Sequence, residues 1–246
     1  MPSLDHWLEG VFGYRGTPET DAELVHSAAL AVRVPVSGRR APEQMLDLIL
    51  KCKQDEDLLL DLLDYLLTNS RRGAGRWAAL EHALSLGGSA WMAVAGQGLQ
   101  RRVDATAQES FSAASAPADL ASEELKQSWD RAFSRDPDAS DAWDHAIKAV
   151  EAVLIPIVIP KQDKPQLGHV VGSFKSQGER WRFVLPGEDM SNSIQPVLAA
   201  LNMLWPNPDR HANEGRRKPT LEEARAAVHL AVTVVQWARA GAIQLR

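Results

Sequence analysis

The sequence predicts a mainly α-helical protein, in which an N-terminal helical layer and one small β-hairpin precede a helical bundle. Apolar residues recur at intervals of three and four over most of the chain, which is the period of an amphipathic helix. A leucine-rich stretch at 55–70 is apolar on more than one face, as expected of a helix buried between others. Alternation of apolar and polar side chains, the pattern of a strand, is confined to 89–103 and 180–186.

The region 1–103 is predicted to hold the N-terminal helical layer and the hairpin. Its helical patterns lie at 18–33, 42–53 and 55–70 and in a stretch that begins near Trp77. The glycine-basic segment 71–76 has no strand before it and lacks the spacing of a phosphate-binding loop, so we expect an exposed turn there. Beyond a pair of glycines, the alternation around Gly96-Gln97-Gly98 predicts a β-hairpin near 89–103.

The region 104–246 is predicted to be a helical bundle with short polar connections and one short strand. Helical patterns occupy 105–117, 118–137, 141–156, a shorter segment after Pro165, 193–205, and the stretch from Thr220. Capping residues stand before three of these helices: Asp138 or Ser140, then Ser191 or Ser193, and finally Thr220 with Glu223. The last pair has the T-x-x-E spacing of a capping box, in which two side chains satisfy amides at the start of the helix.

Composition narrows the classes of protein to consider. With 246 residues, of which 45% are hydrophobic and 24% charged, the chain resembles a globular protein with a sizeable core. Its net charge of -5 argues against coating nucleic acid with the whole surface, but allows a local basic site. The start lacks the layout of a signal peptide, and the longest apolar run, 149–160, contains Pro156. We therefore expect a cytoplasmic protein without a membrane span.

Cys52 is the only cysteine, which excludes a disulfide within the chain. Its place in an apolar helical pattern favours a packed side chain over a nucleophile, because no base partner is identifiable beside it.

Polar chemistry is concentrated at 205–220, WPNPDRHANEGRRKPT, between two apolar stretches. A histidine near its ordinary pKa can act as an acid or a base at neutral pH, and arginine can clamp phosphate through two hydrogen bonds. The segment adjoins the start of the last helix, whose unpaired amides attract anions. On that helix, Arg225 and His229 lie one turn apart on a polar face. The expected phosphate- or RNA-binding residues are Arg216, Arg217, Lys218 and Arg225.

Several stretches resemble the C-terminal domain of bacterial abortive-infection proteins. They are DPDASDAWDHAIKAVEAVLIPIVIP, LAALNMLWPNPDRHANEG and the pattern T-x-E-E-A-x-x-A-V-H-L-A, while LSLGGSAWMAVAGQGLQRRV is similar to the hairpin upstream in such proteins. The resemblance covers roughly residues 80–246. It implies a helical domain similar to the HEPN group, many of whose members are metal-independent ribonucleases in phage defence or toxin–antitoxin systems and often form dimers.

The resemblance implies a site that needs no metal and no cofactor. Active members of the HEPN group bring an arginine and a histidine, separated by a short spacer, together across a dimer. Here Arg210 and His211 are adjacent and three residues separate Arg225 from His229, so neither pair has the usual spacing. The candidate catalytic residues are Arg210, His211 and His229. The expected partners are RNA, a second copy of the chain and a regulatory protein.

Two hypotheses stay open. In the first, the chain is a phage-defence protein that binds or cleaves RNA through 205–229. In the second, it is a non-catalytic interaction or sensor module that dimerises or binds a protein partner, and its polar residues form a solvated helix face and a surface connection. His145 shares a helix with Asp144 and Glu151, but the spacing of a zinc-binding helix is missing, so we expect a surface position without a metal.

Overall fold

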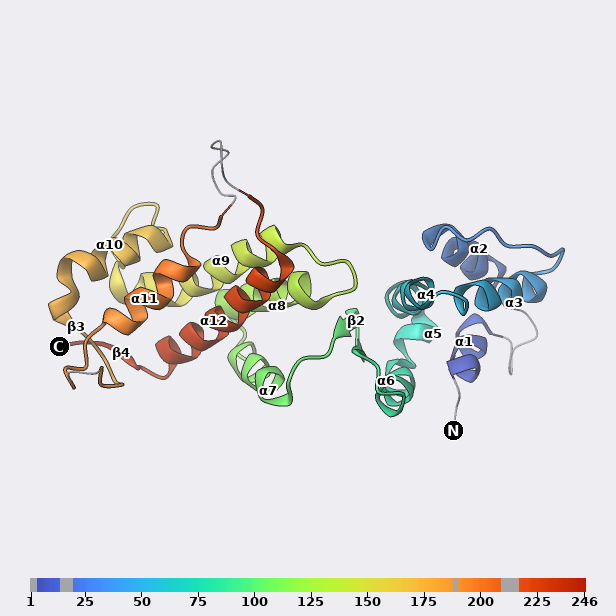
Figure 1. Cartoon of the computed structure of the whole chain (residues 1–246), viewed down its shortest axis with the longest axis horizontal. Coiled ribbons are helices and arrows are strands. Elements are labelled where there is room, and N and C mark those ends of the chain that lie inside the picture. Colours follow the sequence, from blue (N-terminus) through green and yellow to red (C-terminus); the bar gives the residue numbers. More distant parts are fainter. Residues whose placement is uncertain (1–3, 14–19, 188–189, 209–216) are drawn as a thin grey trace. The chain divides into compact units, whose positions relative to one another are not determined.

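A computed structural model describes residues 4–13, 20–187, 190–208 and 217–246. The chain is divided into two compact units, residues 1–102 and 103–246. Both units consist mainly of helices, and the strands of the described ranges form two short antiparallel pairs (Figure 1). No helix in these ranges is long and apolar enough to cross a membrane. The predicted mainly α-helical class with a small hairpin is confirmed.

The N-terminal unit is a group of helices that ends in a β-hairpin. In chain order it contains α1 (Leu4–Phe12), α2 (Ala22–Ala31), α3 (Ala41–Cys52), α4 (Glu56–Asn69), α5 (Arg71–Ala74), α6 (Trp77–Leu86), β1 (Trp91–Val94) and β2 (Gly98–Arg101). The leucines of α4 form much of the core: Leu62, Leu63 and Leu66 are at most 1% exposed. Cys52, at the end of α3, is fully buried in the same cluster, as its apolar surroundings predicted.

Two carboxylates hold the hairpin against the helices. β1 and β2 pair antiparallel, with Ala93 opposite Leu99. The outward amide of Leu99 donates to Asp64 Oδ1 on α4 at 2.6 Å, and that of Ala93 donates to Glu81 Oε2 on α6 at 2.8 Å. These bonds satisfy amides that the two strands cannot satisfy between themselves. The predicted hairpin is confirmed, and it is fixed by helices on both sides.

The segment 71–76 is mostly exposed, as we expected, but it begins as a short helix and not as a turn. Its first four residues form the short helix α5, and Ser70 Oγ accepts a hydrogen bond from the Gly73 amide at 3.3 Å. Gly73 is buried, and a Cβ at this position would collide with the Leu66 carbonyl of α4. Glycine is needed here for the close approach of two backbones, which the local sequence does not reveal.

The C-terminal unit is the predicted helical bundle. In chain order it contains α7 (Ala105–Ala114), α8 (Leu120–Phe133), α9 (Ala139–Val158), α10 (Leu167–Gln177), the 3-10 helix η1 (Gly178–Arg180), β3 (Trp181–Phe183), α11 (Gln195–Leu204), α12 (Leu221–Arg239) and β4 (Ile243–Leu245). Helices α8, α9 and α12 run alongside one another, and α10 and α11 pack onto α9 and α12 respectively (Figure 1). Asp138 is the cap of α9, since its Oδ1 accepts from the Ser140 and Asp141 amides at 3.0 Å.

A second strand pair closes the C-terminal unit. β3 confirms the short strand expected at 180–186, and it pairs antiparallel with β4. Neither β4 nor the first helix, α1, was predicted.

The start of α11 differs from the expected cap at Ser191 or Ser193. The capping position is Ile194, whereas Ser193 Oγ accepts from the Gln195 amide at 3.2 Å.

Candidate functional site

The structure describes part of the predicted site at the start of α12. Arg217, Lys218, Arg225 and His229 are described, whereas Arg210, His211 and Arg216 lie outside the described residues. The predicted capping box is present: Thr220 Oγ1 accepts from the Glu223 amide at 3.2 Å, and Glu223 Oε2 accepts from the Thr220 amide at 2.9 Å. The helix that was expected to carry the site therefore begins at the predicted residue.

Arg217 and Glu223 form an ion pair over this capping box. One guanidinium nitrogen of Arg217 donates to Glu223 Oε2 at 2.7 Å, and a second donates to Oε1. The guanidinium, together with the Thr220 amide, lowers the pKa of Glu223 to about 2, and the carboxylate raises the pKa of Arg217. Lys218 is exposed beside this pair and makes no ion pair with any residue in the described ranges. Within the described ranges, Lys218 is thus a cation without an ion pair next to the helix start, and Glu222 in the first turn is an exposed carboxylate without one.

Three polar residues of α12 contact α7 and α8 and are half-buried, so they do not form a solvated face, whereas Glu222 in the first turn is exposed. Arg225 Nε donates to the Ala132 carbonyl at 3.0 Å, and Gln236 Nε2 donates to the Ser110 carbonyl at 3.0 Å. Arg239 donates to the Ala114 carbonyl and to both carboxylate oxygens of Asp119, at 2.6 and 2.8 Å. Because the last carbonyls of a helix lack partners within it, cationic side chains are favourable neighbours for the ends of α7 and α8.

His229 lies among aromatic rings. Its ring centroid is 5.5 Å from that of Trp129, edge to face, and 5.6 Å from that of Phe133. Trp129 in turn stacks on Phe111 at 4.1 Å, and the Arg225 guanidinium lies 5.4 Å from the Phe133 ring centroid. Burial lowers the pKa of His229, because the neutral imidazole is easier to remove from water than the cation. Arg225 and His229 are thus brought together, as predicted, but at a contact between helices.

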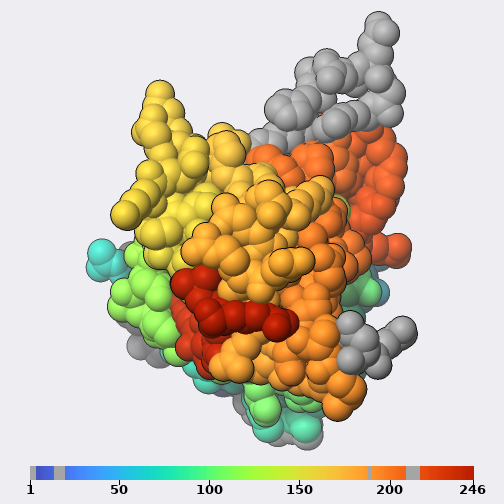
Figure 2. All heavy atoms as spheres, turned by 90° about the vertical axis from the view of Figure 1, so that its left-hand side faces the viewer, coloured from blue at the N-terminus to red at the C-terminus, as the bar shows by residue number. Residues whose placement is uncertain are grey.

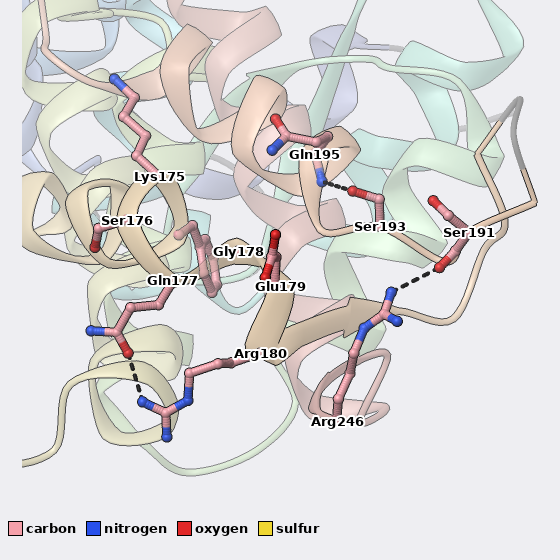
Figure 3. A pocket seen from close by; sticks show the side chains of 11 residues that line it. Lys175, Ser176, Gln177, Gly178, Glu179, Arg180, Ser191, Ser193, Gln195 and Arg246 are labelled. Carbon is pink, nitrogen blue, oxygen red and sulfur yellow. Dashed lines mark hydrogen bonds between the residues drawn. The ribbon is translucent and has the colours of Figure 1, made fainter.

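A polar pocket of about 690 Å³ lies at the end of the C-terminal unit where β3 and β4 meet. Figure 2 looks onto this end, where the last residues (red) lie against the orange residues of the α10–α11 region. Three cationic side chains and one carboxylate line the pocket: Lys175, Arg180, Arg246 and Glu179. Serine hydroxyls and glutamine amides supply the rest of its polar wall (Figure 3). Such a lining can hold a small polar ligand that carries an acidic group.

Hydrogen bonds fix the arginines of this pocket. The Arg246 amide donates to the Arg180 carbonyl at 2.8 Å, and its guanidinium donates to the Ser191 carbonyl at 2.8 Å. The Arg180 guanidinium donates to Gln177 Oε1 at 2.7 Å, while the Glu179 carboxylate points towards the start of α11 (Figure 3). The sequence did not indicate this pocket because its residues come from separate segments. The basic alternation at 180–186 was the one local signal.

The acidic residues around His145 make separate contacts. His145 Nδ1 lies 2.5 Å from Glu124 Oε2 on α8, and the histidine side chain is 13% exposed, so it is less superficial than expected. Asp144 pairs with Lys148 at 2.8 Å, and Glu151 accepts from the Leu167 amide at 2.6 Å. Within the described part of the chain, no three histidine, cysteine, aspartate or glutamate residues are grouped so that they could hold a metal ion.

Comparisons with protein-family models, with curated proteins and with solved structures found no match for this chain.

Proposed function

We propose that the C-terminal unit binds RNA, as part of a bacterial phage-defence protein of the abortive-infection type, through the basic residues that precede α12. The supporting observation is the exposure of Lys218 and Arg217 beside the first turn of a 19-residue helix. Phosphate is attracted both by the two cations and by the partial positive charge of the helix start. Because a phosphate can replace the carboxylate of Glu223 as the partner of Arg217, both side chains are available for RNA.

Under this proposal, Arg225 and His229 hold helices together and do not contact RNA. The Arg225 guanidinium already donates to a carbonyl at the end of α8, and burial among aromatic rings lowers the pKa of His229. Proton transfer to RNA needs a group that reaches the 2'-hydroxyl or the leaving oxygen. We therefore propose that the described residues bind RNA and do not cleave it. Cleavage of RNA by Arg210 and His211 is tested on the same samples.

The experiment measures binding of the full chain to labelled single-stranded RNA by fluorescence anisotropy at several salt concentrations. The test variant is Arg217→Ala with Lys218→Ala, and the charge control is Lys126→Ala, an exposed lysine of α8. We expect wild type and control to bind alike and the double variant to bind several-fold more weakly with a shallower salt dependence. Absence of RNA binding by wild type, or equal loss in the control, would overturn the proposal.

Cleavage is read from the same samples by gel electrophoresis, with and without a chelator. Intact RNA in the wild-type samples agrees with binding alone. Chelator-resistant cleavage that disappears in both Arg210→Ala and His211→Ala would replace the binding proposal with a metal-independent nuclease.

A non-catalytic interaction module is the second candidate, and it is favoured by exposed leucines in the N-terminal unit. Leu30, Leu46 and Leu50 are 71%, 44% and 62% exposed on α2 and α3. Leu46 and Leu50 lie one turn apart on α3, and large apolar side chains exposed on one helix face are typical of protein contact surfaces. Sedimentation of the full chain over a range of concentrations tests self-association: a monomer at all concentrations would contradict a dimerising module.

A further inference from the structure

The N-terminal unit has an apolar groove between α2 and the connection that follows it. The groove has a volume of about 510 Å³, and its lining includes His26, Leu30, Arg33, Val34 and Pro35. Leu30 is 71% exposed at its edge. A mainly apolar concavity with a few polar groups is the usual form of a binding site, whereas an isolated surface leucine is not informative.

Arg33 occupies a backbone position that favours glycine. α2 ends in a Schellman motif: the Arg33 amide donates to the Leu30 carbonyl at 3.1 Å, and the Val34 amide donates to the Ala29 carbonyl at 2.9 Å. This motif places Arg33 at φ 57°, in the left-handed region. Glycine adopts that conformation freely and arginine does not, so the side chain is present at a conformational cost. Packing of Val34, which is 9% exposed, completes the motif without any help from the guanidinium.

The Arg33 guanidinium is available to a ligand. Arg33 is one of the residues that line the groove, and its guanidinium makes no hydrogen bond or ion pair with any residue in the described ranges. The neighbouring cation, Lys51 on α3, is already occupied by Asp47 at 2.8 Å and by the Pro35 carbonyl at 2.7 Å. Arg33 is therefore the uncompensated positive charge at an apolar surface, which is complementary to a carboxylate beside an apolar group.

Unused backbone groups favour a polypeptide as the occupant. Val34 and Val36 are among the lining residues, and the Val34 carbonyl and the Val36 amide make no hydrogen bonds within the described ranges. A peptide backbone can satisfy both, while its side chains enter the apolar surface. We propose that this groove docks a segment of a partner protein in which a large apolar side chain stands next to an aspartate or glutamate. The proposal is independent of RNA binding by the C-terminal unit.

The probes are three fluorescein-labelled peptides, GSDLFEGS, GSKLFKGS and GSDAAEGS, titrated to millimolar concentration against the full chain. The test variant is Arg33→Gly, which removes the charge and eases the left-handed backbone, so it leaves the fold intact. The control is Arg39→Ala, another exposed arginine of the same connection. Amide shifts in 15N-labelled protein locate the bound peptide.

We expect only GSDLFEGS to bind, with shifts at residues 26–36, at least tenfold more weakly to Arg33→Gly and equally to Arg39→Ala. Equal binding of the acidic and basic peptides, unchanged binding by Arg33→Gly, or no binding of any peptide would overturn the proposal. Self-association of the chain that Arg33→Gly abolishes would also overturn it, because a second copy would then be the occupant.

Discussion

The Nε of Arg225 lies 3.0 Å from the carbonyl oxygen of Ala132 and joins α12 to the last turn of α8. The carbonyls of that turn have no partners within α8, so the guanidinium provides a hydrogen bond that the helix cannot make itself. Arg225 therefore contributes to the packing of the three central helices of the C-terminal unit.

Loss of this contact should destabilise the C-terminal unit. We expect Arg225→Ala to lower the free energy of unfolding by about 1.5–3 kcal/mol, the range for a hydrogen bond with one charged partner. Urea unfolding followed by tryptophan fluorescence measures the change, with Lys126→Ala as the control. Equal stability of Arg225→Ala and wild type would show that the contact has no structural role.

The stability of the C-terminal unit should fall in mild acid because of His229. Burial lowers the pKa of this histidine from its ordinary 6.5, so the unfolded chain takes up the proton first as the pH falls. The contribution of the neutral ring is complete above pH 6.5 and is lost as the pH falls through the folded-state pKa. When urea unfolding is measured at pH values from 6.5 downwards, the free energy of unfolding should fall less for His229→Phe than for wild type.

The matched control is His82→Phe, which changes an exposed histidine of α6. The same pH dependence in wild type and His229→Phe would mean that His229 titrates like a histidine in water.

Asp119 should stabilise α8 through its amide contact and through Arg239. It is the N-cap of α8: its Oδ1 accepts from the Ser122 amide at 2.9 Å and from Arg239 at 2.6 Å. We expect Asp119→Ala to cost about 1 kcal/mol for the lost cap, and Asp119→Asn to cost less because it keeps the amide contact. These two bonds lower the pKa of Asp119, so its contribution is present above pH 3.8 and is lost below it. Urea midpoints that do not differ between the two variants would contradict this role.

Cys52 should resist thiol reagents while the protein is folded. Burial, with Asp61 and Asp55 nearby, raises the pKa of its thiol to about 11, so little thiolate is present at neutral or mildly alkaline pH. Labelling with a disulfide reagent should therefore require unfolding, and its midpoint in urea should follow that of the N-terminal unit. Rapid labelling of the native protein would place the thiol at the surface.

Features that depend on neighbours in the sequence could be predicted. The Thr220 and Glu223 capping box needs three intervening residues and little else, and the hairpin needs only alternation around Gly96 and Gly98. Both are present at the expected positions. The leucines of α4 likewise showed a buried helix, because they occupy several faces.

Features that depend on distant partners could not be predicted. The spacing of Arg225, Gln236 and Arg239 placed them on one side of α12, but not against the carbonyls of α7 and α8. The polar pocket also depends on distant partners, since Arg246 reaches it only because β4 pairs with β3. The candidate site was thus found as a sequence segment, while the positions of its side chains needed the fold.

RNA binding through the start of α12 is tested most directly by the salt dependence of affinity, compared between wild type and the Arg217→Ala, Lys218→Ala double variant. For single-stranded RNA each phosphate contact contributes about 0.7 to the slope of log affinity against log salt. Loss of two contacts should therefore make the slope shallower by about 1.4. Identical slopes for wild type and the double variant would contradict the assignment of this surface.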